Sequence, residues 1–129
     1  MNWEQQYRRL VQLARTLPPY PDDARDERHL VSGCEAKVWL YVDSSNPDAV
    51  VIRFDSASRI VKGLLALIQQ RLDGQPLAEI RAFDLDALLR AENLENHLTP
   101  SRSNGLRNVA KKLTSDFDAP RSVRSPSAR

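Results

Sequence analysis

The feature that most constrains the fold of this sequence is a helical pattern of apolar residues between positions 58 and 73. The large apolar side chains recur three or four residues apart and form one broad helix face: Ile60, Val61, Leu64, Leu65, Leu67, Ile68 and Leu72. Ser56 can cap the start of this helix, and Gly74 ends it. With 129 residues, the chain is long enough to bury a single core around such a helix.

Two segments ahead of this helix alternate in the manner of β-strands. In residues 37–42, Val, Leu and Val alternate with Trp and Tyr, and residues 50–54 show the same pattern. The intervening residues 44–48, Ser-Ser-Asn-Pro-Asp, have turn chemistry, so an antiparallel hairpin is predicted. Residues 30–32 can add a third strand at the edge.

An amphipathic helix is predicted over residues 3–17, before the hairpin. Asn2 can cap its first turn with Gln5 as the reciprocal partner, and the two prolines at 18–19 stop it. Residues 18–28 are rich in proline and charge and have little to bury, so we interpret them as a surface connector.

Three more helices are predicted after the central one. A short helix follows Pro76, and another covers residues 85–92 with Asp84 as its cap. The last helix covers residues 101–113. Two residues can cap it: Thr99 and Ser101.

These elements predict an α+β fold in which helices cover one face of a small antiparallel sheet of about three strands. We expect residues 1–115 to form a single domain. Residues 116–129 contain few sizeable apolar side chains, so we expect them to be a disordered tail.

Charge and cysteine content exclude several classes of function. Lys and Arg number 19 against 17 for Asp and Glu, and the signs are interspersed, so we expect no nucleic-acid binding. One cysteine cannot supply an internal disulfide or a cysteine-rich metal site. No apolar run approaches the roughly 20 residues of a membrane span, and the N-terminus lacks the apolar core of a signal peptide. We therefore expect a cytoplasmic protein without a bound metal or a membrane anchor.

The single cysteine, Cys34, leaves two interpretations open when the residues are considered alone. Free cysteines are often small buried hydrophobes. Cys34, however, follows Gly33 at a predicted bend, which is typical of an exposed loop. A cysteine hydrolase would need a base, and the spacing of His29 and His97 from Cys34 completes no dyad.

Four blocks of the sequence occur in an order and spacing that together are specific. The first runs from Val31 to Trp39 and contains Gly-Cys-x-x-x-Val-Trp. The other three are Trp3-Glu4 with Tyr7 and Leu17-Pro18, Asp55-Ser56 with Ile60–Leu64, and His97–Leu106. Over about residues 3 to 113 these blocks resemble the SufE/CsdE family of sulfur acceptor proteins.

The resemblance implies that Cys34 accepts sulfur from the active-site cysteine persulfide of a cysteine desulfurase that depends on pyridoxal phosphate. Cys34 would then pass the sulfur to an iron–sulfur scaffold or another acceptor. The cofactor belongs to the desulfurase, so we expect none on this chain. The family fold is similar to that of the IscU-type scaffolds, whose metal-binding cysteines are absent here. Because sulfur transfer needs a cysteine that can extend into a partner, Gly33 would act as a hinge.

The resemblance also implies supporting residues. Arg102 would lie near the cysteine loop and stabilise thiolate charge or bind the partner, and His97 would have a structural, hydrogen-bonding part in the same block. Candidate partner contacts are Glu35, Lys37 and Trp39. The acidic residue after the cysteine is more similar to the CsdE branch, so the desulfurase can be of the SufS or the CsdA type. A regulatory module with an inert Cys34 is the alternative function.

Overall fold

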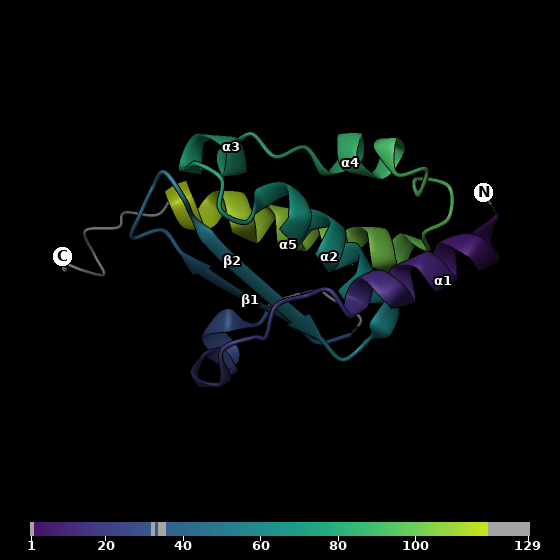
Figure 1. Ribbon diagram of the computed structural model, residues 1–129, viewed down its shortest axis with the longest axis horizontal. Helices are drawn as coiled ribbons and strands as arrows, with labels where there is room; N and C mark the ends of the chain where they lie inside the picture. Colours follow the sequence, from purple (N-terminus) through teal and green to yellow (C-terminus); the bar gives the residue numbers. More distant parts are fainter. Residues whose placement is uncertain (1, 32, 34–35, 119–129) are drawn as a thin grey trace.

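The computed structural model describes residues 2–31, 33 and 36–118 (Figure 1). Within these ranges the chain forms five α-helices, two 3₁₀ helices and one antiparallel sheet of two strands. Their bounds, in chain order, are α1 Trp3–Ala14, η1 Asp22–Ala24, η2 Glu27–His29, β1 Val38–Asp43, β2 Val51–Ser56, α2 Arg59–Leu72, α3 Leu77–Arg81, α4 Leu85–Ala91 and α5 Pro100–Asp118. The predicted α+β class is confirmed.

The sheet is the predicted hairpin, but the prediction of a third strand was wrong. β1 and β2 pair along their whole length, from Val38 opposite Ser56 to Asp43 opposite Val51. In the predicted third strand, Leu30 forms only an isolated bridge with Trp39. η2 ends just before this bridge, and Gly33 just after it has a φ of +79°. The described residues between these two turns, Leu30 and Val31, are too few to form a ladder.

Both faces of the hairpin are covered (Figure 1). Val38 and Leu40 on one face belong to the hydrophobic core, together with residues of α2 and α5. On the opposite face, His29 stacks on Tyr41 with 6.1 Å between ring centroids. Residues 18–28, just before His29, were predicted to have little to bury, but Tyr20 and Ala24 within them are buried.

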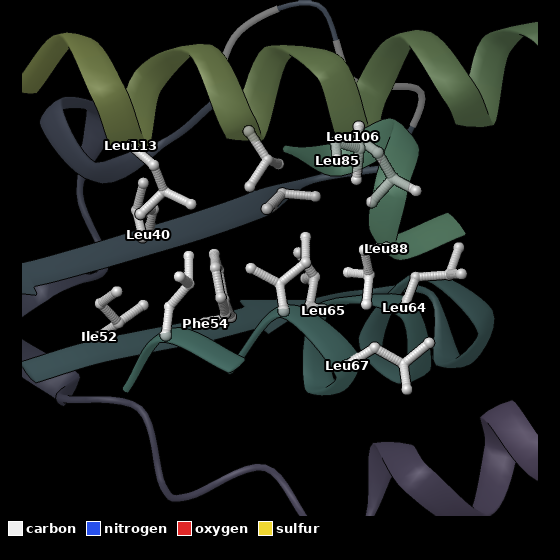
Figure 2. Close-up of a cluster of buried hydrophobic side chains, with 14 of the residues drawn as sticks. Leu40, Ile52, Phe54, Leu64, Leu65, Leu67, Leu85, Leu88, Leu106 and Leu113 are labelled. Carbon is white, nitrogen blue, oxygen red and sulfur yellow. The ribbon is translucent and has the colours of Figure 1, made fainter. Parts of the chain in front are cut away.

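The hydrophobic core lies between the hairpin, α2 and the C-terminal helices. Figure 2 shows the side chains that fill it, contributed by elements that are far apart in the sequence. They include Leu40 and Phe54 of the hairpin, Leu64 and Leu65 of α2, Leu88 of α4, and Leu106 and Leu113 of α5. α5 extends through Asp118, five residues beyond its predicted end, and residues 119–129 of the expected tail lie outside the described residues.

Most predicted helix caps are present. Asn2 and Gln5 form the reciprocal capping box of α1, and Asp84 accepts from the backbone N–H of Ala87 at 3.1 Å. The cap of α2 is Ser58 instead of the predicted Ser56. Ser56 is the last residue of β2, so the chain needs two further residues to leave the strand before the helix can begin.

α2 and α1 are in close backbone contact at Gly63. A Cβ atom at this position would overlap the backbone carbonyl of Leu10 in α1. Glycine is therefore required here because of the space between two helix backbones.

We expect the Gly63→Ala substitution to lower the free energy of unfolding by about 3 kcal/mol, because the added methyl group forces α1 and α2 apart. Urea unfolding followed by circular dichroism measures this loss. Gly74→Ala is the matched control: its position is open but has a φ of +79°, so it should cost only about 1 kcal/mol of backbone strain. Equal losses in the two variants would contradict the close-packing explanation.

Candidate functional site

The predicted loop that carries Cys34, the cysteine loop, enters the hairpin and is held at both ends, at Val31 and at Lys37. Before it, the backbone N–H of Val31 donates to the carbonyl of Val38 at 2.9 Å. After it, the carbonyl of Lys37 accepts from the backbone N–H of Ala57 at 3.3 Å. The two candidates Cys34 and Glu35 lie outside the described residues, so the site is built from the residues on either side of them.

Gly33 joins this loop to α5. Its φ of +79° lies in the left-handed region, which favours glycine. Its carbonyl accepts a hydrogen bond from Nδ2 of Asn108 at 3.3 Å. A Cβ atom at residue 33 would overlap the same carboxamide. The backbone conformation therefore favours glycine immediately before Cys34, and a Cβ atom at this position would also force the end of the Asn108 side chain to move.

A cavity of about 140 Å³ lies beside Ala36. Its lining combines apolar residues with hydroxyl groups and one guanidinium: Ala36, Val38, Ser58, Val61, Ser101, Arg102, Gly105, Leu106 and Val109. Ser58 caps α2, and Ser101 lies in the first turn of α5. The cavity is therefore located at the N-terminal ends of two helices, where backbone N–H groups create partial positive charge.

Arg102 is the charged residue of this cavity. The backbone N–H of Arg102 donates to Oγ1 of Thr99 at 3.3 Å, which confirms Thr99 as a cap of α5. None of the ion pairs between described residues involves its half-buried guanidinium. A guanidinium next to two helix N-termini and apolar walls favours an anion such as a thiolate.

The two histidines lie in other surroundings. His97 stacks on Trp3 of α1 with 5.8 Å between ring centroids, and it does not line the cavity. Nδ1 of His29 is 2.7 Å from a carboxylate oxygen of Asp26, and this hydrogen bond holds the pKa of Asp26 below its usual range. Among the described residues, no three His, Cys, Asp or Glu side chains are arranged to hold a metal ion.

Trp39 and Lys37, two of the candidate partner contacts, differ in exposure. Lys37 is exposed, whereas Trp39 is half-buried beneath Arg25, whose guanidinium carbon is 5.3 Å from the ring centroid. The same guanidinium carbon lies 5.1 Å from the ring centroid of Tyr20. Burial raises the pKa of Tyr20 to about 12. Arg25 thus fixes residues 20–25 over the outer face of β1.

Asp55 of β2 forms an ion pair with Arg25. Nη2 of Arg25 is 2.6 Å from its carboxylate, Nζ of Lys62 is 3.6 Å away, and Ser56 donates its backbone N–H at 2.8 Å. Burial acts to raise the pKa of Asp55. The hydrogen bonds from Arg25 and Ser56 and the charge of Lys62 outweigh it and hold this pKa below its usual range.

The sequence analysis missed three residues of this region. Arg25 lay in a segment interpreted as an exposed connector, and Ser58 was overlooked in favour of Ser56. For Asn108 the sequence contained one signal. It is seven residues from Ser101, so the two residues lie on the same face of the last helix. The residue that it contacts could not be predicted from spacing.

Comparison with known proteins agrees with this arrangement. The profile of the SufE family, described as an Fe–S metabolism associated domain, matches residues 1–117. The chain belongs to the SufE family. The match includes the cysteine loop and every cavity residue.

Two SufE relatives match most of this chain. The cysteine desulfuration protein SufE of Wigglesworthia glossinidia brevipalpis is 36% identical over 110 residues, which are 85% of this chain and 76% of the relative. An uncharacterized SufE-like protein of Rhizobium etli is 34% identical over 115 residues, 87% of this chain and 78% of the relative.

A solved structure shares the fold. The solution structure of a hypothetical protein from Thermus thermophilus matches with a TM-score of 0.75 and 22% identity, over 92% of this chain and 85% of that one. Within the described ranges, no helix of this SufE-family protein has the length and apolar character needed to cross a membrane.

We expect Asp55→Asn to lower stability near neutral pH by about 1 kcal/mol, because Arg25 and Lys62 lose their charged partner at a partly solvated site. Since the folded-state pKa of Asp55 is depressed, its contribution is complete above the unfolded value of about 3.9 and is lost as pH falls through the folded value.

Urea unfolding at several pH values between about 7 and 2 tests this linkage. The wild type should lose more stability on acidification than Asp55→Asn. The exposed Asp23→Asn variant, from the same connector, should follow the wild type. Parallel stability profiles for wild type and Asp55→Asn would contradict the assigned role.

Proposed function

We propose that this SufE-family protein accepts persulfide sulfur on Cys34 from a cysteine desulfurase that depends on pyridoxal phosphate, stimulates that enzyme, and passes the sulfur on to iron–sulfur cluster assembly. The observation that carries the proposal is the family match across the cysteine loop, with a relative named as a cysteine desulfuration protein. The family description, Fe–S metabolism, supports the recipient. Pyridoxal phosphate stays with the desulfurase, and this chain carries no cofactor.

The proposed step is a displacement at sulfur. The Cys34 thiolate attacks the outer sulfur of the desulfurase persulfide, a new S–S bond forms, and the old one breaks. The electron pair of the broken bond goes to the desulfurase cysteine, which leaves as a thiolate. Sulfur moves with no net oxidation or reduction, so no further reagent is needed.

The cavity beside Ala36 supports this chemistry through its charge and its walls. Arg102 and the N-termini of α2 and α5 favour a thiolate or persulfide anion. The apolar side chains of Val38, Val61 and Val109 limit contact with water and with soluble oxidants. Such a setting combines activation of the sulfur with protection of it.

The cysteine must also reach a partner. Gly33 has the backbone freedom to act as the hinge, because its φ lies in a region that other residues rarely adopt. Lys37 is exposed and can contact the desulfurase together with Glu35. Trp39 can contribute only the part of its ring that Arg25 leaves accessible.

Intact-protein mass spectrometry tests the function directly. After incubation with a desulfurase of the SufS or CsdA type, pyridoxal phosphate and cysteine, wild type should gain one sulfur atom that a reductant removes. Cys34→Ser should gain none, and Gly33→Val should gain sulfur more slowly.

Two contrary results have different meanings. If the wild type gains no sulfur but Cys34→Ser still stimulates the desulfurase, the protein is a regulatory module with an inert cysteine. If neither sulfur uptake nor stimulation occurs with either type of desulfurase, the proposed function is wrong.

The role of Arg102 has its own measurement. Because Cys34 is the only cysteine, alkylation by iodoacetamide reports on this thiol alone. We expect Arg102→Gln to raise the apparent pKa of Cys34 by roughly one unit, since a nearby cation favours the thiolate. Arg102→Lys should retain most of the effect. Arg107→Gln is the control, because Arg107 is exposed and paired with Asp86 at 3.0 Å; a shift equal to that of Arg102→Gln would argue against a specific role.

A further inference from the structure

The side chain of Asn108 contacts the backbone at the point where Cys34 is attached. Its Nδ2 donates to the carbonyl oxygen of Gly33 at 3.3 Å. That carbonyl and the backbone nitrogen of Cys34 belong to one planar peptide unit, because the C–N bond between them has partial double-bond character. A hydrogen bond to this oxygen therefore restricts the orientation of the peptide that carries Cys34.

A second side chain of α5 holds the same stretch of chain further upstream. Nζ of Lys112 donates to the carbonyl of Arg28 at 3.1 Å. Asn108 and Lys112 are four residues apart and so lie on one helix face. Between the two contacts, Val31 is hydrogen-bonded to Val38 of β1. Among its described residues, the segment leading to the cysteine thus contacts α5 at Arg28 and Gly33 and the hairpin between these two points.

The carboxamide of Asn108 can lie against residue 33 because this residue is glycine and has no side chain. A Cβ atom at Gly33 would overlap Nδ2 of Asn108. The carboxamide therefore occupies the space next to Gly33 that a larger residue would need. Contact and hydrogen bond together distinguish Asn108 from other polar residues on the surface of α5, such as the exposed Asn104.

We propose that Asn108 is a positioning residue for Cys34, and that its carboxamide holds the peptide unit between Gly33 and Cys34 against α5. The role depends on the proposed function, because the orientation of this peptide matters only if Cys34 reacts. The hydrogen bond is exposed and local, so it affects the freedom of the cysteine peptide more than the stability of the domain.

Two substitutions separate the hydrogen bond from the shape of the side chain. Asn108→Ala removes the carboxamide, and Asn108→Leu retains its approximate size but has no N–H donor. Both residues favour helices, so α5 should fold in each variant. Asn104→Ala and Asn104→Leu are the matched controls on the same helix.

The first readout is alkylation of Cys34 by iodoacetamide, measured across a pH range and compared with the thermal unfolding midpoint. In both Asn108 variants we expect the limiting rate at high pH to rise about two- to tenfold, the range that follows from losing one ordinary hydrogen bond. The unfolding midpoint and both Asn104 controls should stay near wild type. A purely structural role would change the midpoint and leave the limiting rate unaltered.

The proposal is overturned if the limiting rate is unchanged or lower in the Asn108 variants, or if the Asn104 controls rise equally. It is also overturned if only Asn108→Ala changes, because shape would then be the cause. The second readout is the loss of persulfide to a reductant after loading by a desulfurase, which should be faster in the Asn108 variants. If the wild type takes up no sulfur, the proposed function fails, and the alkylation result still decides the role of Asn108.

Discussion

The packing of α2 on both of its sides is the constraint on which the rest of the structure depends. One side meets α1 so closely that Gly63 lies against the backbone of Leu10. The other side packs on β2 and fills the core with leucine side chains (Figure 2). This double contact sets the position at which α2 begins, and its capping residue Ser58 is part of the cavity wall. The electrostatic character of the cavity is therefore a consequence of helix packing.

A buried polar contact positions the part of the cavity that α5 lines. Gln6 of α1 is fully buried, and its carboxamide donates to the backbone carbonyls of Glu92 and Asn93 at 3.1 and 3.3 Å. These carbonyls end α4 and precede the segment that leads into α5. Because buried polar groups are costly when unpaired, this contact specifies one arrangement of the α4–α5 connection relative to α1. Arg102 follows shortly afterwards and lines the same cavity as Ser58.

The candidate site thus combines a rigid framework with a short loop. Helix N-termini and Arg102 come from elements packed in the core, whereas the described residues at and beside the cysteine loop form hydrogen bonds at Val31, Gly33 and Lys37. On the outer face of the hairpin, the Arg25–Asp55 pair and the Trp39 ring keep the connector in place. A sulfur carrier needs both a fixed framework and a loop, since its cysteine has to be activated in one place and delivered in another.

The sequence by itself determined the helices and the hairpin, because periodicity, caps and turn residues act over a few neighbouring positions. It also determined the family, because the four ordered blocks are visible in the sequence itself. It also identified Cys34, Gly33 and Arg102 as candidates. It did not predict that Leu30 forms an isolated bridge, that Tyr20 and Ala24 are buried, or that Ser58 caps α2. Nor did it show that Asn108 reaches Gly33 across 75 positions of the chain. These features depend on contacts between distant segments, and only the packing of α2, α5 and the hairpin brings those segments together.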